Sequence, residues 1–193
     1  MQRPGVQAFL RGDNGLADMG RGLFIGRFQP FHLGHLEAVK TILDKESSII
    51  IAIGSAQYSH TLENPFTAGE RIEMIYRTLT ASGMQLDRCF LIPIPDIGEH
   101  RLWVSRVVSF CPPFNTVYSN NNLVRILFEE EGYKVEPVPY YNRKIYVATE
   151  IRKMMAAGGG WRQLLHPEAV KYLDSIQCEK RLSTITAEKG PNT

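Results

Sequence analysis

Short apolar runs that alternate with helical patterns constrain the fold of this chain more than any other feature. Residues 48–54 read Ser-Ile-Ile-Ile-Ala-Ile-Gly, an unbroken β-branched run typical of a strand buried on both faces. Similar runs, with helical patterns between them, occupy residues 22–28, 89–94, 116–119 and 133–138. Strands and helices that alternate in this way form βαβ units. We therefore predict an α/β fold: a doubly wound parallel sheet of about five strands, Rossmann-like, followed by C-terminal helices.

The chain divides into three parts by pattern. Residues 1–20 are polar, punctuated by glycine and without a clear period, so we expect a disordered extension, with Met19 as an alternative natural start. Residues 21–178 suit a single domain within the 193-residue chain. Beyond Thr149 we expect a short helix, a break at the glycines 158–160 and one or two closing helices up to about residue 176. Residues 179–193 are expected to form a polar tail.

Composition excludes several classes of protein. The formal net charge of +2 argues against a surface that coats nucleic acid, so we expect no nucleic-acid partner. No apolar run reaches the roughly 18 residues of a membrane span, and the N-terminus lacks the apolar core of a signal peptide. The three cysteines lie far apart without a CxxC pair, which suits a reducing compartment. We expect a cytoplasmic protein without a membrane partner.

The strongest local signal is Gly-Arg-Phe-Gln-Pro-Phe-His-Leu-Gly-His at residues 26–35, between the first strand and the first helix. His32 and His35 share a face of the helix's first turn, where free backbone N–H groups and the helix dipole favour anions. Arg27 can hold a phosphate through its fork of donors, and Gly34 permits close approach to the backbone. Two histidines at this spacing could also be metal ligands or surface residues, but no third zinc ligand of clear spacing occurs. We predict a cradle for a polyphosphate.

Four motifs together resemble one known family. His-Leu-Gly-His at 32–35 matches the (H/T)xGH signature of the nucleotidyltransferase superfamily, and Thr149-Glu-Ile-Arg152 resembles its second signature. The strings at 26–35, 53–57 and 64–71 are similar to those of archaeal-type nicotinamide-nucleotide adenylyltransferases. The resemblance runs from about residue 22 to residue 177. Two short segments depart from the family pattern: Val147-Ala148 stand in place of Ser-Gly, and residues 119–122 read Ser-Asn-Asn-Asn rather than Ser-Gly-Asn-Pro.

The resemblance implies a role for each matching residue. His32 and His35 contact the ATP phosphates and stabilise charge at the α-phosphorus, Arg27 binds phosphate near the reacting centre, and Thr149 and Arg152 hold the β- and γ-phosphates. Trp103 stacks on the nicotinamide ring, although a core tryptophan is the simpler alternative. The other residues expected to bind substrate are Gly26, Phe28, Gln29, Gly34, Ser55, Ala56 and Gln57 around the nucleotide, Asp96 and Ile97 on the nicotinamide side, and Ser119 and Asn121 near the switch point.

The implied reaction joins nicotinamide mononucleotide (NMN) to the AMP part of ATP, giving NAD and pyrophosphate. The attacking phosphate has a second pKa of about 6 and is already ionised at pH 7, so no general base is expected. A Mg²⁺ ion should be carried mainly by the ATP phosphates, with no protein ligand assigned. The resemblance also implies a homo-oligomer, a hexamer or another ring-based assembly.

Other functions stay open at this point. The same cradle would serve transfer to a different phosphate, such as pantetheine phosphate, and a nucleotide sensor without turnover would keep the glycines and basic residues. A P-loop ATPase is disfavoured because no GxxxxGK[ST] string occurs. The choice between NMN and its nicotinic acid analogue is not determined.

Overall fold

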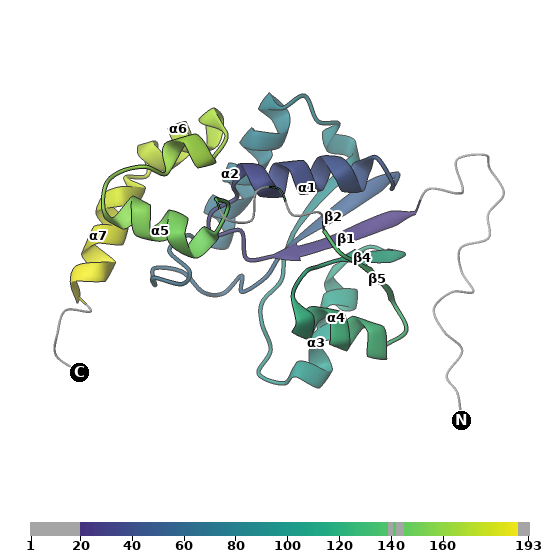
Figure 1. Ribbon diagram of the computed structural model, residues 1–193. Coiled ribbons are helices and arrows are strands. Elements are labelled where there is room, and N and C mark those ends of the chain that lie inside the picture. Colours follow the sequence, from purple (N-terminus) through teal and green to yellow (C-terminus); the bar gives the residue numbers. More distant parts are fainter. Residues whose placement is uncertain (1–19, 139–140, 142–144, 189–193) are drawn as a thin grey trace.

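A computed structural model describes residues 20–138, 141 and 145–188 of the chain. The predicted extension, apart from Gly20, lies outside these residues. A five-stranded parallel sheet forms the centre, in the order β3-β2-β1-β4-β5 (Figure 1). Its strands are β1 (Arg21–Gly26), β2 (Ser48–Ile53), β3 (Cys89–Pro93), β4 (Thr116–Tyr118) and β5 (Lys134–Glu136). The predicted α/β class, parallel sheet and strand number are confirmed.

Helices cover both faces of the sheet, and three further helices gather at one end of the molecule (Figure 1). Helix α2 begins where the predicted capping box stands: Thr67 accepts from the Glu70 amide, and the Glu70 carboxylate accepts from the Thr67 amide. The helices are α1 (Leu33–Leu43), α2 (Ala68–Ala81), α3 (His100–Phe110), α4 (Asn122–Glu130), α5 (Ala148–Ala156), α6 (Pro167–Ser175) and α7 (Cys178–Glu188).

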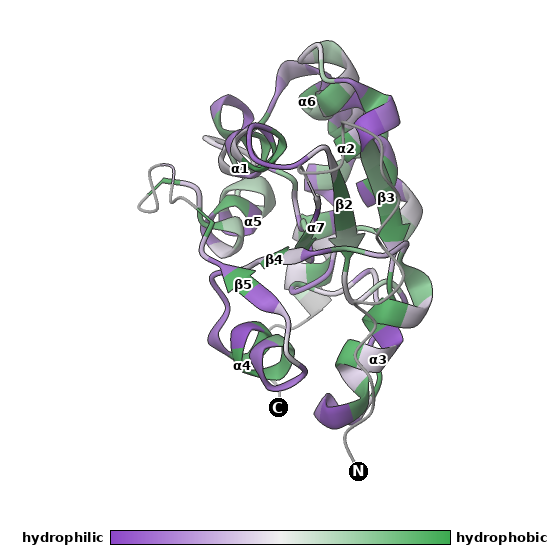
Figure 2. Cartoon of the chain, turned by 90° about the vertical axis from the view of Figure 1, so that its right-hand side faces the viewer, coloured by the Kyte–Doolittle hydropathy of each residue, from purple (hydrophilic) through white to green (hydrophobic). Residues whose placement is uncertain are grey.

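The sheet separates two apolar cores because successive side chains of a strand point to opposite faces. Ile49 and Ile51 of β2 pack with α1, α2 and the C-terminal helices, whereas Ile50 and Ala52 pack with α3 and α4. All four are fully buried, which explains why the strand sequence is apolar throughout. The hydrophobic colouring of β2 and β3 in Figure 2 shows the same central layer.

The prediction of a polar tail from residue 179 is wrong for residues 179–188, which form helix α7 together with Cys178. Leu182 is fully buried in the core that α7 shares with α5 and α6. Arg181 forms two hydrogen bonds of 2.7 Å to the Glu70 carboxylate, so the helix is also tied to the start of α2. The apolar pattern of this segment is too sparse to predict a helix, because its side chains are mostly polar and Cys178 and Leu182 are its buried residues in the core.

None of the helices in the described residues combines the length and the apolar character that a membrane crossing requires.

Candidate active site

Two pockets open where the strand order reverses, beside the carboxyl end of β1. The order reverses there because β2 and β3 lie on one side of β1, and β4 and β5 on the other. The first pocket, of about 450 Å³, lies between β1, α1 and the segment that leads into α5. The second, of about 460 Å³, lies between the ends of β1 and β2 and the helices α3 and α4. Ile25, Gly26 and Asn121 line both, so the pockets share a wall at the switch point.

Most of the predicted site residues line these pockets, and five do not. The first pocket contains Gly26, Phe28, His32, Gly34, His35, Ser119 and Asn121. The second contains Gly26, Arg27, Ser55, Asp96, Ile97, Trp103 and Asn121. Residues outside both are Gln29, Ala56, Gln57, Thr149 and Arg152.

The loops that follow β1 and β2 depend on unusual backbone conformations. Phe28 has φ 50° and Ser55 has φ 51°, in the left-handed region that non-glycine residues rarely adopt. Phe28 folds back over the end of β1, where a Cβ on Gly26 would stand 2.8 Å from its ring. Gly26 is therefore required by the packing of Phe28. Strained residues at the ends of two neighbouring strands are typical of a functional site.

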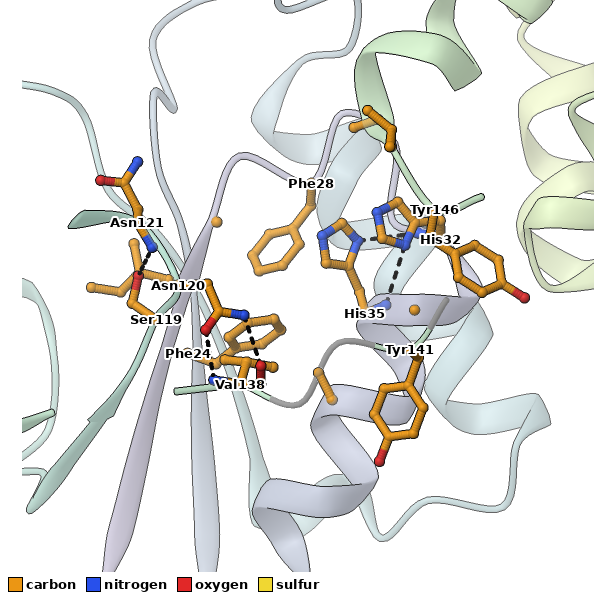
Figure 3. A pocket seen from close by; sticks show the side chains of 16 residues that line it. Phe24, Phe28, His32, His35, Ser119, Asn120, Asn121, Val138, Tyr141 and Tyr146 are labelled. Atoms are coloured by element: carbon orange, nitrogen blue, oxygen red, sulfur yellow. Dashed lines mark hydrogen bonds between the residues drawn. The ribbon is translucent and has the colours of Figure 1, made fainter. Parts of the chain in front are cut away.

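His32 and His35 form a reciprocal cap at the start of α1. The Nδ1 atom of each imidazole accepts a hydrogen bond from the other residue's backbone N–H, at 3.2 Å in both cases (Figure 3). The two rings stack with centroids 3.5 Å apart and 14° between their planes. Since a backbone N–H can only donate, each neutral imidazole must carry its proton on Nε2. The capping contacts thus leave one Nε2–H donor on each ring.

Burial keeps both imidazoles uncharged near neutral pH. It lowers the pKa of His32 from 6.5 to about 4. Burial likewise holds the pKa of His35 well below its ordinary range, and the neighbouring His32 lowers it further. His35 lies among aromatic rings, with centroid distances of 5.0 Å to Phe28 and 5.4 Å to Phe31. The pair therefore presents neutral hydrogen-bond donors, not positive charges.

Tyr146 extends this stack and was not anticipated. Its ring lies parallel to His32 with centroids 5.7 Å apart, and it lines the first pocket (Figure 3). A Cβ on Gly34 would stand 3.1 Å from both the His32 ring and the Tyr146 Cβ, so this glycine makes room for two protein side chains. Sequence spacing offered no signal for Tyr146, since more than a hundred residues separate it from His32.

Arg71 ties the ends of β1 and β2 together. Its buried guanidinium donates to the carbonyl oxygens of Arg27 at 2.9 Å, Gly54 at 2.7 Å and Ser55 at 3.1 Å. Burial lowers its pKa to about 10. Arg71 is the last residue of the motif at 64–71, but no local pattern indicates that its side chain holds both loops.

Arg152 is not brought into either pocket. It donates to the carbonyls of Leu62 at 2.7 Å and Gln29 at 2.9 Å, and to the Thr149 hydroxyl at 3.3 Å. Gln29 is itself buried and exchanges hydrogen bonds with the Phe66 backbone. In this structure these residues therefore stabilise the loop after β1 on the side away from the pockets' lining. Arg27 is the predicted arginine that lines a pocket.

The second pocket is built around Asp96. Its carboxylate accepts from the Ser55 hydroxyl at 2.7 Å and from the Ser55 amide at 3.2 Å. Gln57 hydrogen-bonds the Asp96 backbone from outside the pocket. Trp103 packs edge-on against Phe128 with centroids 5.7 Å apart and also lines the pocket, so it is both a core residue and an accessible aromatic surface.

The two segments that depart from the family pattern both line the first pocket. The Asn120 amide donates to the Val138 carbonyl at 2.7 Å and accepts from the Val138 amide at 3.1 Å, which ties the end of β4 to the segment after β5. Val147 caps α5 without a side-chain hydrogen bond. The Ser119 hydroxyl accepts from the Asn121 amide, and Asn121 caps α4.

Comparisons with known proteins agree on one family. The profile of the Cytidylyltransferase-like family matches residues 23–154. The nicotinamide-nucleotide adenylyltransferase of Saccharolobus solfataricus is 46% identical over 167 residues, which cover 86% of this chain and 97% of that protein. The enzyme of the same name from Thermoplasma volcanium is 50% identical, covering 85% and 93%.

A solved structure shows the same fold. A bifunctional NMN adenylyltransferase/ADP ribose pyrophosphatase from Francisella tularensis, in complex with AMP and a manganese ion, superposes with a TM-score of 0.75 at 25% identity. The match covers 88% of this chain and 52% of that one, so the chain spans about half of the bifunctional protein.

Proposed function

The chain belongs to the nicotinamide-nucleotide adenylyltransferases of the Cytidylyltransferase-like family, an enzyme family of NAD biosynthesis, and we propose that its two pockets are the two halves of the active site. The first receives ATP and the second receives NMN. The observation that carries this assignment is their shared wall at Gly26 and Asn121. Ligands that fill both pockets bring their phosphates together there.

Each pocket offers chemistry suited to its proposed substrate. In the first, the Nε2–H groups of His32 and His35 and the uncapped start of α5 at Val147 provide donors for phosphate oxygens. In the second, Trp103 offers an aromatic surface for the pyridine ring, and Arg27 lies at the phosphate end. Thr149 and Arg152 retain their proposed contact with the β- and γ-phosphates only if the Arg152 guanidinium leaves its backbone partners when ATP binds.

Catalysis then consists of positioning and charge stabilisation. The phosphate of NMN attacks the α-phosphorus in line with the leaving pyrophosphate, and it is ionised without help from a base. The two imidazoles stay neutral because of their burial, and they donate hydrogen bonds to oxygens on which negative charge increases. Their Nδ1 atoms are already occupied by backbone N–H groups, so neither is free to take a proton there.

A divalent ion fits this site only as a partner of the phosphates. The described residues contain no cluster of three or more metal-ligating side chains, and Asp96 is the one carboxylate among those that line either pocket. The Asp96 carboxylate already accepts two hydrogen bonds from Ser55. We therefore assign no protein ligand to the proposed Mg²⁺, which when bound neutralises phosphate charge.

The proposed setting is a cytoplasmic homo-oligomer, a hexamer or another ring-based assembly, without nucleic-acid or membrane partners. Large apolar side chains on α3 and α4 support self-association, since Leu102, Phe110 and Ile126 are 47%, 41% and 51% exposed. Light scattering of the purified protein gives the assembly mass, and a monomer at working concentration would contradict the proposal.

One experiment tests the reaction directly. The protein is incubated with ATP, Mg²⁺ and a panel of phosphorylated acceptors, including NMN and pantetheine phosphate, and products are identified by mass. NAD and pyrophosphate are expected from NMN. Adenylylation of another acceptor with none of NMN would reject the substrate assignment, and ATP binding without any product would indicate a sensor.

A further inference from the structure

The wall of the second pocket contains a histidine that the reaction does not use. His100 is the first residue of α3 and lines the pocket together with Trp103. Residues three apart on a helix share a face, so the two side chains are neighbours on the surface that α3 turns to the pocket. Ile97 lines the same end. A ring that stacks on Trp103 therefore carries its substituent into the neighbourhood of His100.

The imidazole of His100 is available to a ligand. It is exposed, and no hydrogen bond within the described residues engages it. The backbone N–H groups at the start of α3 are also uncapped by any side chain, because Glu99 makes no capping hydrogen bond. Three other polar residues of the pocket already have partners, since Ser55 and Asp96 bind each other and Asn121 caps α4. Arg27 also lines the pocket, but it comes from the loop after β1 and not from α3.

We propose that His100 is a specificity-determining residue, which reads the substituent of the pyridine ring and lets the enzyme accept both the carboxamide and the carboxylate mononucleotide. The inference rests on the proposed function, because it requires the pyridine ring to lie in the second pocket. A neutral imidazole has one donor and one acceptor, and it can pair with either the oxygen or the NH₂ group of a carboxamide. An imidazolium has two donors and a positive charge, and it pairs best with a carboxylate.

The preference between the two acceptors should consequently depend on pH. Histidine is the side chain that ordinarily changes charge between pH 5 and 8. As the pH falls, the carboxylate substrate gains a charge-assisted contact that the carboxamide lacks, and the start of α3 favours the same anion. The ratio of kcat/KM for nicotinic acid mononucleotide to that for NMN should rise about fivefold to tenfold from pH 8 to pH 5.5, the difference between a charged and a neutral hydrogen bond.

Other charged groups near His100 are few. Asp96 faces the pocket from the end of β3 and Arg27 from the end of β1, while Glu99 and Arg101 flank His100 in the chain. Helix α4 contributes uncharged residues, Leu123, Val124 and Leu127, beside Asn121. Aspartate, glutamate and arginine ordinarily titrate outside pH 5–8. The acceptor phosphate titrates near pH 6, but it is common to both substrates and cancels in their ratio.

Internal competition measures this ratio. Both mononucleotides are mixed with limiting ATP and Mg²⁺ at pH 5.5 to 8, and the two dinucleotide products are quantified by mass. The ratio does not depend on the amount of folded enzyme, so a partly unfolded variant still reports it. His100→Gln keeps a polar side chain without the charge and should abolish the pH dependence, whereas His100→Arg should favour the carboxylate at every pH. Arg101→Gln, which removes a charge from the adjacent exposed position of α3, should behave as wild type.

Two results would overturn the inference. A wild-type ratio that stays constant with pH while turnover is normal excludes it, as does a His100→Gln variant that keeps the wild-type pH dependence. Absence of any dinucleotide product from either acceptor would instead reject the proposed function, and the inference with it.

Discussion

Replacing His32 with Asn should make the stability of the protein less sensitive to acid. His32 has a pKa of about 4 in the folded chain, against an ordinary value of 6.5. Between these values the unfolded chain binds a proton that the folded chain does not, so unfolding becomes easier as the pH falls below 6.5. The free energy of unfolding that is lost because of this one group reaches about 2 kcal/mol at pH 5 and on the order of 3 kcal/mol by pH 4. His35 adds to it in the same direction because its pKa is also lowered by burial.

The Asn substitution isolates this effect because it keeps the cap. Asn is among the best N-cap residues, so its side-chain oxygen can still accept the His35 amide hydrogen bond that Nδ1 of His32 accepts at 3.2 Å. The free energy of unfolding is measured in urea at pH 7, 6 and 5. Between pH 7 and pH 5, the free energy of unfolding of His32→Asn should fall by about 2 kcal/mol less than that of the wild type.

A second histidine provides the matched control. His60 is exposed and has φ 57°, a conformation that Asn tolerates, so His60→Asn should leave the pH dependence of unfolding unchanged. If His32→Asn loses as much stability as wild type between pH 7 and pH 5, the imidazole is not held neutral by burial. The assignment of neutral donors to the active site would then be wrong.

Three further predictions concern the site and the C-terminal helix. His35→Ala should lower kcat by about 10²–10³ with a much smaller effect on ATP binding, and His35→Asn should recover part of the lost rate. Two results together would indicate a general-base role instead: a His35→Asn variant as inactive as His35→Ala, and a wild-type kcat that follows one histidine ionisation between pH 6 and 9. Arg71→Met should destabilise the protein by about 3 kcal/mol or more in urea unfolding, since it removes the side-chain donor of the Arg27 and Gly54 carbonyls and one of the two donors of the Ser55 carbonyl. The exposed Arg77→Met should change the free energy of unfolding by less than about 1 kcal/mol. Leu182→Ala should cost about 2–5 kcal/mol of unfolding free energy, and an unchanged urea midpoint would mean that α7 does not pack on the domain.

Features that depend on neighbours along the chain could be predicted from the amino-acid sequence alone. The apolar run at β2 specified a strand buried on both faces, and the Thr67–Glu70 pair specified the start of α2, because period and capping involve residues at most four apart. His32 and His35 were placed together at the start of α1 for the same reason. Strand–helix alternation then implied the parallel sheet and the position of the site at its carboxyl edge.

The partners of each site residue depend on contacts that form only when the chain folds. Arg152 contacts the carbonyl of Gln29, 123 positions away, and Arg71 contacts that of Arg27, 44 positions away, so no local pattern indicates which partners occupy a guanidinium. The packing of α7 on α5 and the stacking of Tyr146 on His32 likewise join residues that no local pattern connects. The charge state of the two histidines also depends on the tertiary structure. Desolvation depends on every side chain that surrounds the imidazole, and those side chains are assembled from several elements only when the chain folds.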